Sequence, residues 1–311
     1  MTLQNRNVAW VHAILDELSR AGVRLVVVSP GGRSAALVAG IAEVGWDIGH
    51  VQTDERAAGF FALGLAKATG RPVAVTVTSG SAVANLLPAL VEADSSDIPL
   101  IVLTADRPQG GRKLGMPQTT DQIGLCAAVV RAALDLGDPS EASADLEALR
   151  GQVAALLPHL CGDRRGPVQI NLPLEGKVTS ADPRPGWTPP PLSELARHGR
   201  RGPDGSPLPM REAPAASVPQ RDWPGLSRRL GLRPGMRGIL FAAVDCPLPP
   251  AQVAELSRRL GFPLLADAAS GLRRPGMPHL VTSADLQTLI GIEHKERPDL
   301  LIRLGGAPVA H

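Results

Sequence analysis

The sequence has 311 residues, enough for two domains with separate cores, and its 44% hydrophobic and 20% charged residues are typical of a folded globular protein. Its formal net charge is only +2, without a run of basic residues, which argues against a nucleic acid or a membrane surface as the main partner. Aromatic residues make up 3% and tyrosine is missing, so platforms that stack bases are not expected.

The N-terminal residues lack the basic and apolar regions of a signal peptide, and no uninterrupted apolar run approaches the ~20 residues that span a bilayer. Three widely spaced cysteines, Cys126, Cys161 and Cys246, form no CxxC pair. We interpret them as buried free thiols rather than as a disulfide framework or a zinc site. These features predict a cytoplasmic protein.

The first half alternates strand and helix signals. Strands are predicted at residues 25–29, 48–51, 73–78, 100–104 and 166–173, and helices at residues 9–21, 34–42, 55–68, 82–93 and 145–157. The strands are short apolar runs and the helices carry apolar residues at helical spacing. Repeated strand-helix-strand units predict the α/β class, with a parallel, helix-covered sheet and a working face at the carboxyl ends of its strands.

A change of composition separates this half from the rest. Residues 184–224 are rich in Pro, Gly and Arg and are predicted to be a linker between a first domain at 1–183 and a second at 225–311. The second domain repeats the α/β pattern, with strands at 238–243, 263–266 and 300–304 and a helix at 251–260. The sequence ends directly after the last of these strands, so we expect this domain to be truncated.

Four polar segments directly follow predicted strands: residues 29–34, 54–56, 78–81 and 105–108. Parallel strands would bring all four to one edge of the sheet, where α/β proteins bind their ligands. Glu55 is the most suggestive residue, because it stands where a strand gives way to a helix. The alternative is that Asp54 or Glu55 only caps this helix.

Three strings carry a resemblance: Asp54-Glu55-Arg56 with Gly59, Thr-Ser-Gly-Ser-Ala-Val-Ala-Asn-Leu at 78–86, and Leu-Thr-Ala-Asp-Arg-Pro at 103–108. They resemble the thiamine-diphosphate enzymes, and within that family the branch of menaquinone biosynthesis. The resemblance covers residues 1–183 and, more loosely, the remainder. It implies a pyrimidine-binding first domain and a transferase (carboligase) that joins 2-oxoglutarate to isochorismate with loss of CO₂.

The resemblance also implies roles for particular residues. In the family, a carboxyl group at the position of Glu55 hydrogen-bonds N1′ of the aminopyrimidine and promotes proton removal from C2 of the thiazolium, after which the cofactor carries the carbanion chemistry. Pro30 and Thr78 are expected to contact the same cofactor.

The substrate-binding residues implied by the resemblance are Arg33, Arg107 and Gln118, which would hold the carboxylate and hydroxyl groups of the substrates. An alternative is that Arg107 pairs with Asp106 on the surface, and that Arg33 and Gln118 are ordinary polar residues of turns and loops. Gly32 stands where the family usually has Ser, which leaves the placement of Arg33 open.

Thiamine-diphosphate enzymes hold Mg²⁺ or Mn²⁺ with a Gly-Asp-Gly string and an Asn-Asn string some ~30 residues later. Neither string occurs here. In the family, a segment like residues 302–309 is followed by a basic residue of the substrate site, and this sequence has Ala310 and His311 there instead. We therefore expect a chain without metal ligands, inactive until a diphosphate-binding domain is supplied, and assembled as a homodimer or with that domain. Two alternatives stay open: an acetolactate-synthase-like carboligase, against which residues 104–108 and Gln118 argue, or a non-catalytic fragment or regulatory module.

Overall fold

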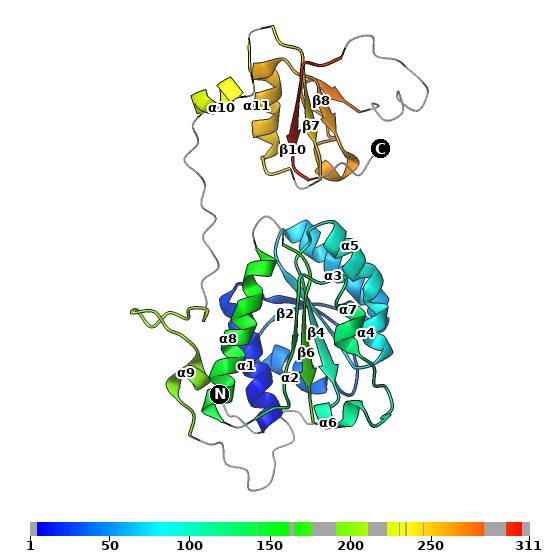
Figure 1. Cartoon of the computed structure of the whole chain (residues 1–311), viewed down its shortest axis with the longest axis vertical. Helices are drawn as coiled ribbons and strands as arrows, with labels where there is room; N and C mark the ends of the chain where they lie inside the picture. The colour runs from blue at the N-terminus through cyan, green and yellow to red at the C-terminus, as the bar shows by residue number, and fades with distance from the viewer. Residues whose placement is uncertain are drawn as a thin grey trace. The chain divides into compact units, whose positions relative to one another are not determined.

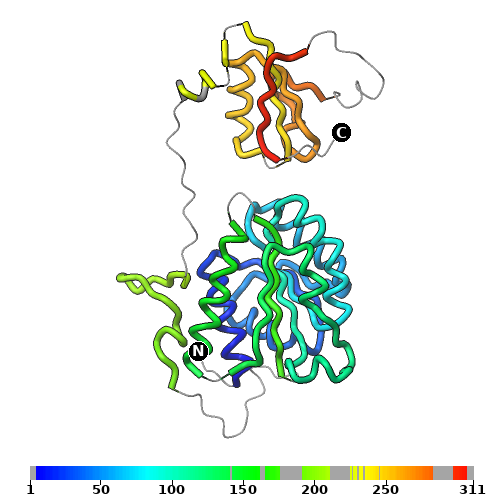
Figure 2. The backbone as a smooth tube through the Cα atoms, viewed as in Figure 1, coloured from blue at the N-terminus to red at the C-terminus, as the bar shows by residue number. Residues whose placement is uncertain are grey.

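The computed structural model describes residues 5–140, 142–161, 165–175, 191–210, 223–229, 231–233, 235–244, 246–282 and 297–306. Contacts divide the chain into two compact units, Met1–Ser217 and Val218–His311, each built on its own sheet (Figures 1 and 2). The boundaries of the predicted domains and linker stay a prediction. Within the described residues no helix is both long and apolar enough to cross a membrane.

The first unit contains a six-stranded sheet in which every paired strand is parallel. Its order is β2 (Asp47–Val51), β1 (Leu25–Val28), β3 (Val73–Val77), β4 (Leu100–Asp106), β6 (Val168–Pro173) and β5 (Ala132–Asp135). The predicted α/β class with a parallel sheet is confirmed. Strand β5 was not predicted, because it is only four residues long and alternates between half-buried and exposed residues.

Helices cover both faces of this sheet, as Figure 1 shows. One core packs α1 (Arg6–Arg20), α2 (Ala35–Glu43) and α8 (Ser143–Leu156) against residues such as Val26 and Val28. A second core packs α3 (Glu55–Thr69), α5 (Leu87–Ser95) and α7 (Gln122–Cys126) against residues such as Val27. Successive residues of a strand point to opposite faces, which is why a continuous apolar run such as β1 serves two cores.

The helix predicted at residues 82–93 is in fact two, α4 (Ser81–Asn85) and α5. Pro88 lies in the first turn of α5. Because proline has no N–H to donate to the carbonyl one turn earlier, one continuous helix would lose a bond there. Short α6 (Gln109–Arg112) follows β4, and a 3₁₀ turn, η1 (Leu157–Leu160), follows α8.

Part of the segment that we predicted as a linker is folded onto the first unit. It contains α9 (Glu194–His198), and the Arg20 guanidinium donates to the carbonyls of His198, Arg200 and Leu208. Its composition gave no sign of this, because the bonds go to its backbone and depend on an arginine some 180 residues earlier. The remaining residues of the predicted linker, apart from 223–224 at the start of α10, lie outside the described ranges.

The second unit has a parallel four-stranded sheet, β10 (Leu300–Leu304), β7 (Gly238–Ala242), β8 (Leu264–Ala266) and β9 (Leu280–Val281). Helices α10 (Trp223–Arg229) and α11 (Pro250–Leu260) and a 3₁₀ turn, η2 (Ala268–Ser270), complete it. All three strands and the helix predicted here are confirmed. The three cysteines are free, as predicted. Cys126 is buried, but Cys246 is only partly buried and Cys161 is exposed, so the prediction of three buried thiols is confirmed for Cys126 alone.

Candidate functional site

The turn after β1 lies directly against the end of β3. The Ser29 N–H donates to the Thr76 carbonyl over 2.9 Å, and a Cβ added to Gly31 would lie 2.4 Å from the Cβ of Thr78. Strand order reverses between β1 and β3, and parallel sheets bind ligands at the carboxyl ends of strands at such a point. Pro30 and Thr78, both predicted to contact the cofactor, therefore belong to adjoining segments.

Glu55 is the first residue of α3, and it is not the helix cap. Asp54 caps the helix, because its carboxylate accepts the Ala57 N–H over 2.8 Å. The half-buried Glu55 instead accepts a hydrogen bond from Asn85, at the end of α4, over 3.0 Å. Gly59, one turn further on, is so close to Leu86 and Ala89 that a side chain there would clash. The backbone of α3 is thereby held against α4 and α5, with the Glu55 carboxylate at the edge of the sheet.

Arg107 and Gln118 come together through the loop that follows β4. The Arg107 guanidinium donates to the Pro117 carbonyl over 2.7 and 3.3 Å, and the Ser79 hydroxyl donates to the Gln118 carbonyl over 3.1 Å. Gln118 has a φ of 60°, a left-handed conformation that is uncommon for residues other than glycine. The loop thus folds back over the turn after β3 and leaves the Gln118 side chain exposed.

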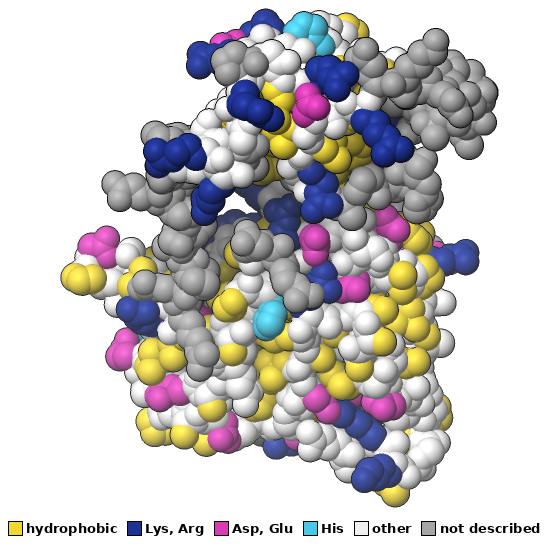
Figure 3. Space-filling view, turned by 45° about the horizontal axis from the view of Figure 1, so that its top comes forward, with side chains coloured by type: hydrophobic (Ala, Val, Ile, Leu, Met, Phe, Trp, Pro, Cys, Tyr) yellow, Lys and Arg dark blue, Asp and Glu magenta, His cyan; other side chains and the backbone are white. Residues whose placement is uncertain are grey.

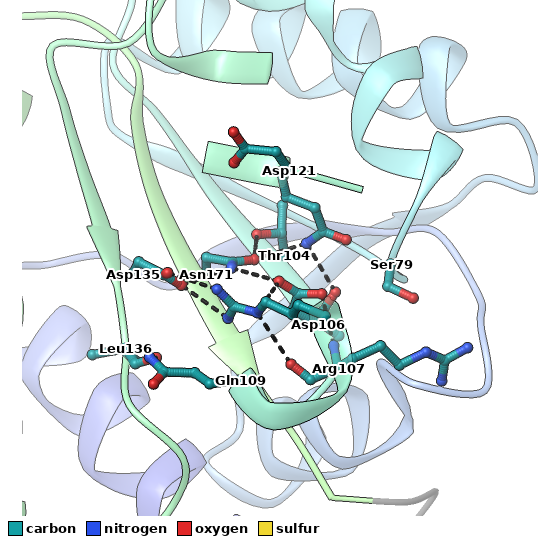
Figure 4. Close-up of polar contacts among 12 residues, drawn as sticks. Ser79, Thr104, Asp106, Arg107, Gln109, Asp121, Asp135, Leu136 and Asn171 are labelled. Atoms are coloured by element: carbon teal, nitrogen blue, oxygen red, sulfur yellow. Dashed lines mark hydrogen bonds and ion pairs between the residues drawn. The ribbon is translucent and has the colours of Figure 1, made fainter. Parts of the chain in front are cut away.

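Below this loop lies a buried polar network centred on Asp106 (Figure 4). The Asp106 carboxylate accepts bonds from Asn171 over 2.9 Å and from the Arg107 N–H over 2.7 Å, and pairs with Arg112 over 3.0 Å. The suggestion that Arg107 pairs with Asp106 on the surface is therefore wrong. Burial raises the pKa of Asp106, while the bonds from Asn171 and Arg107 and the Arg112 charge oppose that rise.

Asn171 and Gln122 extend this network to the neighbouring segments. The Asn171 amide donates to Asp106 and Asp135, and its oxygen accepts from Thr104 and Gln122. Gln122 in turn accepts the Gly80 N–H over 2.7 Å. These two positioning residues were not predicted from the sequence. The signal for Asn171 was an amide side chain inside the mostly apolar strand β6, whereas Gln122 starts the short helix α7 and had no such signal.

Arg33 lies in the turn after β1, and its side chain reaches past β3 and β4 to the end of β6. Its guanidinium donates to the Leu174 carbonyl, just beyond β6, over 2.8 Å. The Ser34 hydroxyl, next to it, closes the turn by donating to the Gly31 carbonyl over 3.0 Å. The structure therefore places all six predicted site residues in turns or helix starts at one edge of the sheet, and their roles stay predictions.

The arrangement fits part of thiamine diphosphate. Glu55 offers a carboxylate with a single hydrogen bond from its described surroundings, so acceptor positions are left for a ring nitrogen. Gly31 and Thr78 pack so closely that no side chain fits between them, and they belong to the same edge of the sheet as Glu55. For the metal there is no comparable fit: the described residues contain no group of three or more His, Cys, Asp and Glu side chains that could hold an ion.

Comparison with known proteins agrees with this geometry. Residues 9–125 match the family described as thiamine pyrophosphate enzyme, N-terminal TPP binding domain. Three relatives named 2-succinyl-5-enolpyruvyl-6-hydroxy-3-cyclohexene-1-carboxylate synthase come from Halobacterium salinarum (36% identical over 100% of this chain and 53% of the relative), Myxococcus xanthus (37%, 97% and 51%) and Geobacillus kaustophilus (36%, 97% and 50%).

This chain spans about half the length of the curated relatives it matches. The resemblance stated from its motifs is confirmed by the family match and by the names of these relatives. Residues 9–125 therefore match the N-terminal TPP binding domain of the thiamine pyrophosphate enzymes, and almost the whole chain is similar to about half the length of the named synthases.

Proposed function

We propose that this chain forms the pyrimidine-binding part of an enzyme of menaquinone biosynthesis that adds 2-oxoglutarate, with loss of CO₂, to isochorismate. The observation that supports it most is the position of Glu55. Its carboxylate lies at the carboxyl edge of the sheet and does not cap the helix, because Asp54 does so. The relatives' shared name gives the product, and the resemblance of the motifs implies the two substrates.

When bound, thiamine diphosphate supplies the carbanion chemistry of the reaction. Glu55 would hold a proton at N1′ of the aminopyrimidine, while Pro30 and Thr78 line the ring. Arg107 and Arg33 carry planar guanidinium groups that suit carboxylates, and Gln118 can donate to or accept from a hydroxyl. Because Arg107 comes from the β4 end and Arg33 from the β1 turn, they would hold different parts of the substrates.

We further propose that the diphosphate and its Mg²⁺ or Mn²⁺ ion are held by residues outside these 311. The Gly-Asp-Gly and Asn-Asn strings do not occur in the sequence, and the described residues offer no substitute. A cytoplasmic location is part of the same proposal, since free thiols suit a reducing compartment.

The test is to assay the chain alone and then with a polypeptide that carries both strings, supplied separately or by fusion. We expect no measurable product from 2-oxoglutarate and isochorismate with the chain alone, even with excess thiamine diphosphate and Mg²⁺. The assembled protein should form the succinyl-cyclohexene product. Turnover by the purified chain alone would overturn the proposal that residues outside these 311 hold the diphosphate and its metal ion. An assembly that uses pyruvate in place of isochorismate as the acceptor would favour the acetolactate-synthase-like alternative.

We also propose that the chain is a homo-oligomer. Five large hydrophobic side chains are exposed on β2, α3 and α5: Ile48, Val51, Phe60, Phe61 and Val91, which are 38 to 56% exposed. We call them the β2–α3 patch. Figure 3 shows exposed hydrophobic side chains on the side of the first unit where α3 and α5 lie. A patch of this kind commonly marks a protein interface, and a second copy is the partner always present.

A further inference from the structure

A hollow lies at the opposite edge of the first unit, away from the candidate functional site. Its volume is about 310 Å³, and its cationic lining is Arg20, Arg24, Arg150, Arg197, His198 and Arg201. Arg20 ends α1 and Arg24 immediately precedes β1, so the hollow lies at the amino ends of the strands. We call it the α1–α9 pocket.

Two of these arginines are buried and fixed. Arg150 is 3% exposed, and it pairs with Asp16 over 2.6 Å and with Glu17 over 2.9 Å. Arg20 is 5% exposed, and it pairs with Asp16 over 3.0 Å while donating to backbone carbonyls of the α9 segment. Asp16 and Glu17 offset the charge of these two guanidinium groups, but the groups form a fixed wall of the pocket that needs little reorganisation when an anion arrives.

One carboxylate, Asp16, lines the pocket, and it pairs with Arg20 and Arg150, as does Glu17 beside it. These pairs involve two of the five lining arginines, so the lining keeps a positive charge. Arg24 and Arg197 are exposed and take part in no ion pair with the described residues. These two approach the pocket from different segments, the turn before β1 and helix α9.

We propose that the α1–α9 pocket is a binding site for a small anion with two or more negative charges, of phosphate or polycarboxylate type. Guanidinium groups bind both types in paired hydrogen bonds, and the volume is at the lower end of that of small-molecule sites. The bound anion bridges Arg24 with Arg197 and thereby fastens the α9 segment to α1. The site is separate from the proposed cofactor site and does not depend on the proposed function.

The experiment is isothermal titration calorimetry on the full chain with inorganic phosphate and, separately, with citrate, at constant ionic strength set by NaCl. We expect saturable binding of at least one of these anions with a stoichiometry of one. In the double variant Arg24→Gln/Arg197→Gln, affinity should fall by at least about tenfold, since two charge-assisted contacts are lost. Arg71→Gln, an exposed arginine of the α3–β3 turn, is the matched control and should bind as the wild type does.

The two anions identify the class of ligand: phosphate alone indicates a phosphorylated compound, and citrate alone a polycarboxylate. Failure of both to bind above the NaCl background would overturn the proposal, and so would unchanged binding in the double variant. Circular dichroism checks that the variant is folded, which the exposure of both arginines favours. Glu55→Gln should leave this binding unchanged, so the result is independent of the cofactor site.

Discussion

The side chain of Glu55 accepts a hydrogen bond from Asn85, while its neighbour Asp54 caps α3. The two acidic residues therefore have separable tasks, and each can be changed without removing the other. An amide at position 55 can still accept from Asn85, but it has no acidic proton to share with a ring nitrogen. This separation allows a direct test of the proposed acid.

Glu55→Gln should slow exchange of the C2 proton of bound thiamine diphosphate by about 10² to 10⁴ in the assembled enzyme, the usual loss for a positioned acid-base group. The exchange is followed by NMR. Asp54→Asn is the matched control, because asparagine caps helices as well as aspartate does and the exchange rate should stay unchanged. Exchange at the wild-type rate in Glu55→Gln would refute the assignment.

Arg107→Lys should act on substrate binding instead. Both donor atoms of Arg107 that contact Pro117 belong to the guanidinium fork, which lysine lacks. We expect KM for isochorismate to rise by about tenfold, a loss typical of one charge-assisted bond, while C2 exchange continues at its normal rate. Steady-state kinetics and the NMR experiment separate these effects. A fall in C2 exchange equal to that of Glu55→Gln would contradict the role given to Arg107.

At this scale the motifs predicted which positions to examine but not their geometry. Two adjacent acidic residues before a helix look alike in sequence, and only the contact with Ala57 shows that Asp54 is the cap. Likewise Asp106 and Arg107 are neighbours in the chain, yet the ion pair is with Arg112. Such choices depend on residues that are distant in sequence or on backbone direction, which local patterns do not report.

At the scale of elements, the amide of Asn171 on β6 holds β4, β5 and α7 together. Both amide hydrogens and the oxygen of this side chain are used, so the side chain is fully satisfied in a buried position. Networks of this kind specify one arrangement of the strands, and a missing member leaves the others unpaired. The loop that carries Arg107 and Gln118 rests on this network.

Asn171→Leu should destabilise the fold by about 3 kcal/mol, because buried Asp106, Thr104 and Gln122 each lose one hydrogen bond that no other group replaces. Asn171→Asp should also destabilise at neutral pH, since it sets a third carboxylate beside Asp106 and Asp135. Burial already raises the pKa of Asp106, and an added negative charge raises it further. A raised carboxylate pKa means that the folded state binds the proton more tightly than the unfolded state, so Asn171→Asp should regain stability relative to the wild type as pH falls.

Urea unfolding at pH 7 and pH 5 measures both variants, and Gln152→Leu, at an exposed position of α8, is the control, with an expected change within ±0.5 kcal/mol. Equal stability of Asn171→Leu and the wild type would show that the network does not support the strands. A stability difference between Asn171→Asp and the wild type that does not shrink at lower pH would contradict the electrostatic reason.

Elements with a strong local pattern could be predicted, and those that depend on distant partners could not. Apolar runs gave β1, β3, β4 and β6, and helical spacing gave α1 and α8. Strand β5 is half exposed, and its pairing with β6, some 35 residues later, stabilises it as a strand. The α9 segment is likewise held by α1 and α8, and its own Pro- and Gly-rich sequence shows no such preference.

At the scale of the whole molecule, the β2–α3 patch predicts self-association. Phe60→Asp should convert the wild-type oligomer to a monomer, because a buried charge at an interface is costly while the same residue is exposed in the monomer. Light scattering at several concentrations measures the mass. Leu114→Asp is the control, an exposed leucine outside the patch, and should leave the mass unchanged. A wild-type chain that stays monomeric at high concentration would contradict the prediction.

The first unit also predicts where the chain can be cut. A fragment of residues 1–217 should be more stable than one of residues 1–183 by about 3 kcal/mol or more in urea unfolding. The shorter fragment lacks Met210, whose N–H is accepted by fully buried Glu17, and Ala196, whose carbonyl accepts from Arg150. Buried charged groups that lose a partner are strongly destabilising. Equal stability of the two fragments would show that the α9 segment is only loosely attached.

The bond between Glu17 and Met210 has a consequence for the chain as it is made. The two residues are 193 positions apart, so at ribosomal rates of about 5 to 20 residues per second Glu17 waits on the order of 10 to 40 s for its partner. During that time Arg20 and Arg150 can already pair with one oxygen of the Glu17 carboxylate, but the other oxygen lacks the Met210 N–H and the α9 segment is not yet in place over α1. Translation speed through residues 184–210 thus becomes a determinant of how much of the nascent protein reaches the native state.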